Sequence, residues 1–410
     1  MIFLKLGFRS LFRQKRRTAV SLLVLTFGIG CLLLTDSHSR YIKWGLREST
    51  IHSETGHIQI FQRDFFLREE SRVLEFGLED VEALRNELLR LRDVSLVQAR
   101  IDFMGLVSNG EKSVACLGQG VEPAQEKRLR GLFRMPAATY DALAARGDDV
   151  HVIALGAGLA RSLGVKAGDS VTFMSTTAAG ALNAMDLTVA ATFRGFSAEY
   201  DARAAVVPLR TAQLLLDTSK VKSLIVTLDA TERTDAVFDR IGRLARDKGF
   251  PIVLKKWHER ALYYRQVEGF YKQVTGFLSV VLFLIIFFST SNTILMAVVE
   301  RTPEIGTLLA LGTSRRQTLT MFLSEGMFIG LIGGALAAAF AFLATRGLNA
   351  LNIILPPPPG LTDGYPLSFR LSSASTALIA LGAVAASALA SILPTLRAAR
   401  MRIVDALGHI

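Results

Sequence analysis

Four long stretches of this sequence contain no lysine, arginine or aspartate, and they limit the chain to folds that place these stretches in a membrane. They cover residues 18–35, 274–299, 319–344 and 375–394, with lengths of 18, 26, 26 and 20 residues. A helix of about 20 residues crosses the roughly 30 Å hydrocarbon core of a bilayer. We therefore predict an integral membrane α-helical protein with four transmembrane helices per chain.

Basic residues are unevenly distributed among the segments that flank the four stretches. The cations assigned to one side of the membrane lie in residues 1–17, 300–318 and 395–410: Lys5, Arg9, Arg13, Lys15, Arg16, Arg17, Arg301, Arg315, Arg316, Arg397, Arg400 and Arg402. The link 345–374 holds only Arg346 and Arg370. Because cytoplasmic flanks collect lysine and arginine, we expect a multi-pass membrane protein with both termini in the cytoplasm.

This distribution also accounts for the net charge of +11. The cytoplasmic segments carry a surplus of positive charge, and the rest of the chain is nearly balanced. No basic stripe with interleaved aromatic residues remains, so we expect no nucleic-acid partner. A basic segment before the first stretch also suits a cleaved signal peptide, but no small-x-small site follows Leu32, Leu33 and Leu34, which favours an uncleaved anchor.

The segment between the first and second stretches, residues 36–273, is long enough for one or two folded domains. Its ends predict stalk helices, and its interior alternates between strand and helix patterns. We expect strands at 56–62, 187–194, 204–207 and 223–228, helices at 78–91, 209–216 and 234–248, and a helix, a turn and a strand within 154–174. The pattern predicts a large α+β extracytoplasmic domain in two lobes, divided near residue 120, with the chain crossing back near 225.

No pattern in this region indicates catalysis or a metal site. Five histidines, at positions 38, 52, 57, 151 and 258, are scattered without the spacing of zinc ligands. No G-x-S-x-G turn occurs, and Cys31 and Cys116 are too few for a disulfide framework. We expect no catalytic residues and no metal, and we expect this domain to bind a partner or transmit force.

The link 300–318 predicts one short helix of about nine residues. Thr302 is expected to cap it, Pro303 to occupy its first position, Glu304 to face the positive end of its dipole, and Gly312 to end it. A capping box of Ser314 and Gln317 then begins the third membrane helix.

The apolar side of this short helix, formed by Ile305, Leu308, Leu309 and Leu311, is expected to need a cover. Either a groove of a partner protein or the lipid headgroups can provide it, and the residues alone favour neither.

Small residues in the third and fourth stretches predict close helix packing. Gly326, Gly330 and Gly334 are spaced by four residues, and Gly382, Ala386 and Ala390 offer a matching face. Glu325 is an intramembrane acid that needs a partner, for which Arg315 or Arg316 is expected. In the link 345–374, PPPPG at residues 356–360 predicts a stiff outer loop.

Three segments resemble one family. The segment 296–334, MAVVERTPEIGTLLALGTSRRQTLTMFLSEGMFIGLIGG, is similar to ABC transporter permeases of the FtsX, MacB and lipoprotein-releasing LolC/LolE families. The tail 391–407, SILPTLRAARMRIVDAL, resembles their closing signature, in which a proline ends the last span, and 155–171 resembles a turn of their extracytoplasmic core domain.

The resemblance implies a dimeric four-span permease whose link 300–318 is the coupling helix that docks on an ATPase. The coupling residues are Glu300, Arg301, Thr302, Pro303, Glu304, Ile305, Gly306, Leu308, Leu309, Leu311 and Gly312. An ATPase fused to this chain is not expected, because no Gly-Lys dipeptide occurs and a Walker A loop needs one. The implied partners are two copies of a separate ATPase that carries ATP and Mg, a second permease of the same or a related sequence, and a periplasmic carrier or adaptor.

Three functions fit this resemblance. The first is extraction of lipoproteins from the outer leaflet of the inner membrane. The second is MacB-like export of a peptide, drug or glycolipid with a periplasmic adaptor, and the third is FtsX-like mechanotransmission to a cell-wall hydrolase. The near absence of charge within the spans favours a lipid-anchored or amphiphilic cargo over a polar solute.

Overall fold

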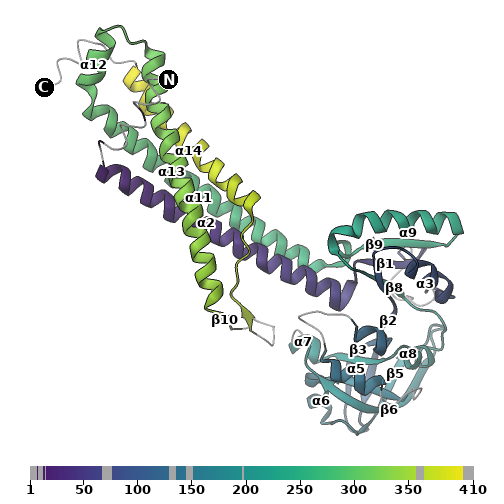
Figure 1. Ribbon diagram of the computed structural model, residues 1–410. Coiled ribbons are helices and arrows are strands. Elements are labelled where there is room, and N and C mark those ends of the chain that lie inside the picture. The colour runs from purple at the N-terminus through teal and green to yellow at the C-terminus, as the bar shows by residue number, and fades with distance from the viewer. Residues whose placement is uncertain are drawn as a thin grey trace. The chain divides into compact units, whose positions relative to one another are not determined.

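The computed structural model describes residues 7, 13, 15–66, 76–128, 135–144, 151–195, 198–356 and 364–399 (Figure 1). The chain divides into two compact units. We call the first the helical unit: Met1–Lys43, Val267–Ile354 and Pro366–Ile410. We call the second the strand-rich unit: Trp44–Gln266 and Leu355–Tyr365.

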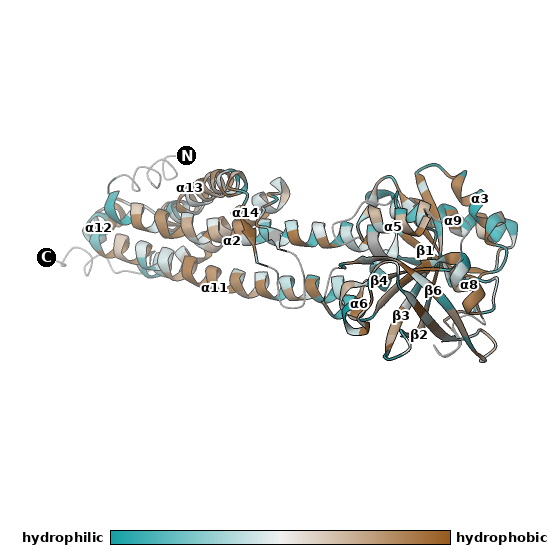
Figure 2. Cartoon of the chain, turned by 90° about the horizontal axis from the view of Figure 1, so that it is seen from below, coloured by the Kyte–Doolittle hydropathy of each residue, from teal (hydrophilic) through white to brown (hydrophobic). Residues whose placement is uncertain are grey.

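Long helices form the helical unit. They are α2 (Lys15–Thr50), α11 (Leu262–Glu300), α13 (Arg315–Ala350) and α14 (Ser373–Ala399), with the short α12 (Thr302–Ala310) between α11 and α13. The four long helices are apolar and long enough to cross a membrane, and Figure 2 shows hydrophobic residues along them. The prediction of four membrane helices is confirmed. Two short strands, β10 (Ile354–Leu355) and β11 (Tyr365–Pro366), follow α13, and residues 357–360 of the PPPPG motif lie outside the described residues.

The helices extend beyond the apolar stretches. α2 continues past residue 35 to Thr50, and α11 begins at Leu262, well before residue 274. The expectation that Pro394 ends the last helix is wrong, because α14 continues through it to Ala399. Proline is tolerated inside membrane helices, although its missing amide hydrogen leaves the carbonyl four residues earlier, that of Ala390, without its helical donor.

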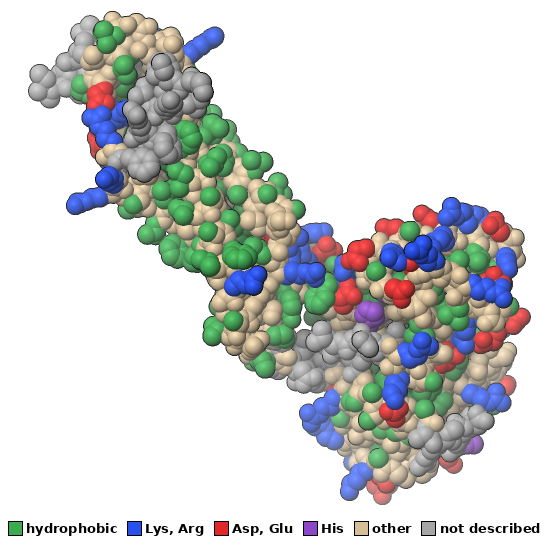
Figure 3. Space-filling view, in the orientation of Figure 1, with side chains coloured by type: hydrophobic (Ala, Val, Ile, Leu, Met, Phe, Trp, Pro, Cys, Tyr) green, Lys and Arg blue, Asp and Glu red, His purple; other side chains and the backbone are tan. Residues whose placement is uncertain are grey.

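Buried side chains from all four long helices hold the helical unit together. One cluster joins Leu25, Ile29 and Leu33 of α2 to Ile294 of α11 and Phe322 of α13. The outer surfaces of the helices are apolar too, and hydrophobic side chains cover the face of this unit shown in Figure 3. Such a surface is expected where lipid or other membrane helices surround the protein.

The strand-rich unit contains nine strands and several shorter helices among its described residues. The strands are β1 (Ile58–Gln62), β2 (Val94–Ser108), β3 (Ser113–Val121), β4 (Val152–Gly156), β5 (Ser170–Thr176), β6 (Leu182–Phe193), β7 (Ala204–Pro208), β8 (Ser223–Leu228) and β9 (Ile252–Lys256). The helices are a π-helix (Ile51–Thr55), α3 (Val81–Leu89), α4 (Pro123–Glu126), α5 (Ala137–Ala144), α6 (Ala157–Leu163), α7 (Ala198–Asp201), α8 (Leu209–Leu215), a 3-10 turn (Thr231–Arg233), α9 (Thr234–Lys248) and α10 (Trp257–Arg260).

The nine strands form one sheet in the order β3-β7-β4-β6-β5-β2-β8-β1-β9, and β3 also pairs with β2. That additional pairing closes the first six strands into a ring. The pairs β3–β7 and β4–β6 are parallel, and the other pairs are antiparallel. Phe173 and Val107 are fully buried in the core of this unit, where the apolar sides of the strands meet.

The α+β fold in two lobes is confirmed, but the lobes are divided differently. The first half of β2 pairs with β8, and its second half, from Ile101, pairs with β3. The division therefore lies within β2 near residue 100 and not near 120, so that β3 belongs to the closed ring.

Candidate functional site

The ends of α12 are set by its neighbours in sequence. Arg301 occupies the N-cap position, but its side chain makes no capping hydrogen bond to the backbone of α12. The Thr302 hydroxyl donates to the Val298 carbonyl at 3.0 Å. The expectation that Thr302 caps the helix is wrong: α12 follows α11 after one residue, so a carbonyl of α11 is within reach of this hydroxyl. Pro303 lies in the first turn, and Gly312, with φ of 93°, provides the left-handed exit.

One side of α12 packs into the helical unit. Ile305 is 1% exposed and belongs to the same buried cluster as Phe322, and Leu309 packs partly against that cluster. Gly306 is buried beside them. The expected exposed apolar side is therefore split, and Ile305 and Leu309 attach α12 to the membrane helices of its own chain.

The other side of α12 is open. Leu311 is 79% exposed, Pro303, Thr307 and Ala310 are exposed as well, and Leu308 is half-buried. We call Pro303, Thr307, Ala310 and Leu311 the outward surface. Thr307 and Ala310 were not predicted because the candidates were selected by hydrophobicity, although Thr307 follows Pro303 by four residues and Ala310 follows Thr307 by three, which indicates a shared face.

Ion pairs surround the first turn of α12. Arg13 lies 2.6 Å from Glu304, and Arg17 lies 2.5 Å from Glu300 at the end of α11. Arg301 also contacts Glu304, at 3.2 Å. Slight burial favours the neutral form of Glu304, but hydrogen bonds and charges from Arg13 and Arg301 outweigh it and hold the pKa of Glu304 below its usual range.

Glu325 lies near this cluster. Its side chain is only 5% exposed, and the Arg301 guanidinium lies 3.9 Å away. The same guanidinium lies 6.0 Å from the centre of the Phe322 ring. The expected partners, Arg315 and Arg316, are wrong: about ten residues of helix separate them from Glu325, or roughly 15 Å, which an arginine side chain does not span. The acid thus connects α13 to the start of α12.

The helices α13 and α14 approach closely at two glycines. A Cβ atom at Gly326 would lie 2.8 Å from the Ser391 Cβ, and one at Gly330 would lie 2.8 Å from the Val384 Cα. Real Cβ atoms are not found this close to other heavy atoms, so larger residues at these positions require the helices to separate. The structure places both residues at the expected seam.

The remaining members of the predicted seam differ. Gly334 faces Ala380 at an ordinary distance of 3.5 Å. Gly382 is exposed, with nothing within 4 Å of its Cβ position, so its expected place in this seam is wrong. Ala386 and Ala390, which were expected in this seam, are buried, and Ala383 is buried in place of Gly382, because a stripe of residues spaced strictly by four rotates gradually around a helix of 3.6 residues per turn.

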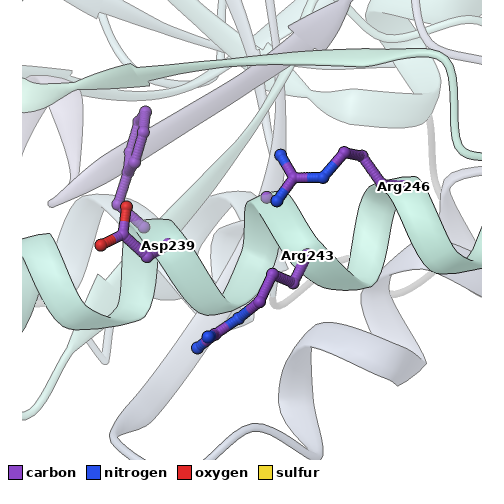
Figure 4. A pocket seen from close by; sticks show the side chains of 5 residues that line it. Asp239, Arg243 and Arg246 are labelled. Atoms are coloured by element: carbon purple, nitrogen blue, oxygen red, sulfur yellow. The ribbon is translucent and has the colours of Figure 1, made fainter.

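Surface hollows elsewhere do not resemble a catalytic site. One of about 300 Å³ on α9 is lined by Phe238, Asp239, Gly242, Arg243 and Arg246. Figure 4 shows Asp239, Arg243 and Arg246 on successive turns of this helix. The hollow is open, and the charged side chains are exposed to solvent. The described residues contain no group of three or more histidines, cysteines or acids placed to hold a metal ion.

Comparison with known proteins assigns both parts of the chain. Residues 276–403 match the FtsX-like permease C-terminal family, and residues 18–244, more than half of the chain, match the MacB-like periplasmic core domain. The chain belongs to the FtsX/MacB/LolC family of ABC transporter permeases. This permease is therefore a multi-pass membrane protein, and its strand-rich unit is of the MacB periplasmic core type.

Several relatives resemble this permease. The lipoprotein-releasing system transmembrane protein LolC of Xylella fastidiosa (strain Temecula1) is 27% identical over 316 residues, covering 73% of this chain and 74% of that protein. The macrolide export ATP-binding/permease protein MacB of Shewanella sp. (strain ANA-3) is 34% identical over 122 residues, 29% of this chain and 16% of that protein. The permease YvrN of Bacillus subtilis is 33% identical over 118 residues.

Family members are the membrane component of ABC transporters and work with ABC ATPases. In this permease α12 lies within the part that matches the FtsX-like family.

Proposed function

We propose that this permease extracts lipoproteins from the outer leaflet of the bacterial inner membrane, using ATP hydrolysed by a separate ATPase. The supporting observation is the extent of its likeness to a LolC protein, whose name describes lipoprotein release and which aligns with 73% of this chain. The likeness to MacB is stronger in identity but confined to 29% of the chain.

In the proposed assembly, two ATPase subunits bind the cytoplasmic side of two permease chains, either identical or related. The twelve cations of the segments 1–17, 300–318 and 395–410 support a cytoplasmic position for these segments, α12 and both termini. The strand-rich unit then lies in the periplasm, where a carrier or adaptor receives the cargo. ATP and Mg²⁺ belong to the ATPase, since the sequence lacks the Gly-Lys dipeptide of a Walker A loop.

Movement begins at the outward surface when the ATPase subunits close on ATP. Ile305 and Leu309 transfer the displacement of α12 to the membrane helices that they contact. The contacts at Gly326 and Gly330 leave no space between α13 and α14, so these two helices move together. α11 is one continuous helix from Leu262 to Glu300, and it carries the movement to the strand-rich unit, in which it begins.

The chemistry of the spans suits a lipid-anchored cargo. Glu325 is the only acid in the four apolar stretches, which contain no lysine, arginine or aspartate. A path for polar solutes would need polar groups facing water along its length. Acyl chains instead require an apolar surface, and the exposed side chains of α11, such as Phe277 and Phe288, provide one.

The test is reconstitution of the permease and its ATPase in proteoliposomes that contain a fluorescent triacylated lipoprotein. We expect ATP-dependent release of this lipoprotein to a soluble acceptor. Leu311→Asp is expected to reduce release per ATP hydrolysed at least tenfold, because it replaces the most exposed large apolar side chain of the outward surface with a charge. Leu311→Met keeps volume and polarity and serves as the control.

Lipoprotein that stays in the liposomes while ATP is hydrolysed contradicts the proposed cargo. Wild-type release by Leu311→Asp contradicts the role of the outward surface. MacB-like export is the second candidate, favoured by the 34% identity to a macrolide exporter. It predicts ATP-dependent movement of a macrolide and no release of the lipoprotein.

A further inference from the structure

The first membrane helix carries a stripe of residues whose chemistry changes with depth. Positions 13, 17 and 21 are Arg13, Arg17 and Ser21, and the spacing of four places them on one face of a helix. The stripe continues with Leu25 and Ile29, which are 0% and 1% exposed. Charge, hydroxyl and hydrocarbon therefore follow each other along one side of α2.

Each polar member of the stripe has a partner on the same side. Arg13 pairs with Glu304 of α12 at 2.6 Å, and Arg17 pairs with Glu300, the last residue of α11, at 2.5 Å. Ser21 and Thr293 of α11 share a buried hydrogen bond of 2.6 Å. The three contacts thus attach α2 on both sides of the bend at which α11 becomes α12.

The contact at Glu304 extends into the rest of the unit. Arg301 lies 3.2 Å from Glu304 and 3.9 Å from Glu325 of α13. One chain of alternating charges therefore runs from α2 through the first turn of α12 to α13. A displacement of Glu304 changes contacts with both neighbouring helices.

The ion pairs Arg13–Glu304 and Arg17–Glu300 are accessible to water. The side chains of Arg13 and Glu304 are 66% and 41% exposed, and those of Arg17 and Glu300 are 29% and 45% exposed. Pairs of this kind are individually weak and are weakened further by salt. They therefore position the helices relative to one another and contribute little to stability.

We infer that Arg13, two residues before α2, and Arg17, within α2, are positioning residues that hold the start of α2 at the junction of α11 and α12. Motion of α12 then reaches the strand-rich unit through α2 as well as through α11. The functional part of this inference rests on the proposed role of α12 as the element that an ATPase moves, but the contacts themselves do not.

The contacts can be tested without any ATPase, by hydrogen exchange of Thr302–Ala310 in the full chain in nanodiscs. Arg17→Glu is expected to speed exchange about two- to fivefold, the range expected for an exposed ion pair. Arg13→Glu is expected to have a similar effect. The double variant Arg13→Glu/Arg17→Glu is expected to speed exchange roughly tenfold or more. Arg16→Glu is the matched control: it makes the same change of charge beside Arg17, at an exposed position.

Swapping the charges of Arg17 and Glu300 gives the sharpest result. The double variant Arg17→Glu/Glu300→Arg is expected to restore wild-type exchange, since it rebuilds the pair with reversed charges. Raising NaCl from about 0.05 M to about 0.5 M is expected to speed exchange in the wild type but not in Arg13→Glu/Arg17→Glu. Equal effects of Arg16→Glu and Arg17→Glu, or no rescue by the exchanged pair, would overturn the inference.

A second measurement, in the reconstituted transporter, separates this inference from the proposed function. We expect Arg13→Glu/Arg17→Glu to lower lipoprotein release per ATP about fivefold, with rescue in Arg17→Glu when Glu300→Arg is added. If Leu311→Asp uncouples the transporter and the arginine variants do not, the inference fails and the proposed function stands. If no lipoprotein is released, the proposed function fails, and if Leu311→Asp has no effect, the proposed role of the outward surface fails. In both cases hydrogen exchange still decides whether Arg13 and Arg17 hold α12.

Discussion

The helical unit and the strand-rich unit satisfy their buried polar groups in different ways. In the helical unit, hydroxyl groups bond to carbonyls of their own helix: Ser324 to Met321 at 2.7 Å, and Ser391 to Ala388 at 2.7 Å. In the strand-rich unit, Arg100 pairs at 2.5 Å with Glu126, on a different element. Local bonds do not specify which helices are neighbours, whereas long-range bonds do. The comparison indicates that the helices, apart from the closely packed pair α13 and α14, can shift against each other, and that the strand-rich unit moves as one body.

The exceptions in the helical unit lie in two places. Ser21–Thr293, Arg17–Glu300 and Arg13–Glu304 are long-range polar contacts near α12. Further along α2, the His38 ring contacts the Ser368 carbonyl at 3.1 Å, and the Arg370 amide donates to the Ser37 carbonyl at 3.1 Å. Between these two places, α2 is held mainly by apolar packing of Leu25, Ile29 and Leu33.

The largest expected effect breaks the long-range pair in the strand-rich unit. The side chains of Arg100 and Glu126 are 5% and 2% exposed. Burial opposes the charge of Arg100, but the carboxylates of Glu126 and Asp102 outweigh burial and raise its pKa, so Glu126→Ala leaves a cation buried. We expect the free energy of unfolding of this unit to fall by about 3 to 5 kcal/mol, measured by urea unfolding of the full chain with Trp257 fluorescence.

An exposed pair in the same unit provides the control for Glu126→Ala. Lys127 and Asp141 lie 2.6 Å apart, with side chains 49% and 52% exposed. Asp141→Ala is expected to cost less than about 1 kcal/mol. Similar costs for the two substitutions would show that the buried charges do not fix this unit.

A second effect concerns acid, which acts on buried His57. Its Nδ1 accepts the Leu228 amide hydrogen at 3.1 Å. Burial, aided by the charges of His52 and Arg47, lowers the pKa of His57 from 6.5 to about 3. The unfolded chain therefore binds the proton first, and the stability present above pH 6.5 is lost as the pH falls towards 3.

Between pH 6.5 and 4.5 we expect this unit to lose about 2 to 3 kcal/mol through His57. His57→Asn removes the titrating group and retains an acceptor for the Leu228 amide. Urea unfolding of both chains at several pH values measures the effect. An equal loss in the variant would assign the acid sensitivity to other groups.

The smallest effect is expected in the helical unit. Ser387 is fully buried, and its hydroxyl has no hydrogen-bond partner among the described residues. Ser387→Ala is expected to change the stability of the helical unit by less than about 1 kcal/mol, or to raise it slightly, because it removes an unsatisfied polar group. Resistance to denaturation by SDS in mixed micelles measures this change.

Gly330→Leu, at the same contact, is the opposing control. A Cβ atom there would lie 3.0 Å from the Ser387 Cβ, so we expect a cost of about 1 to 3 kcal/mol or more. A large cost for Ser387→Ala would contradict the difference between the two units.

The features that the sequence predicted well depend on local patterns. Apolar length gave the four helices, the Ser314–Gln317 capping box is present at α13, and the helix expected at 234–248 is α9. Each of these is determined by residues within a few positions of one another.

The features that were missed depend on residues far apart. Strand β2 was not expected, although residues 97–103, VQARIDF, alternate between apolar and polar as a strand does. Gln98 and Arg100 are buried because α4 supplies Glu126, which both side chains contact, and these contacts are not visible in the local sequence. The pairing of Arg301 with Glu325 likewise depends on how α12 folds against α13.

The pairing of β3 with β2 has a consequence for solubility. Because these strands close the ring, β9 is the one strand of the described nine-stranded sheet with a single neighbour. An exposed strand margin invites edge-to-edge association between molecules, and charged residues on it discourage this. Here the edge strand β9 ends with Lys255 and Lys256 and is preceded by Pro251. At high local concentration, these residues oppose the pairing of β9 with the edge strand of another molecule.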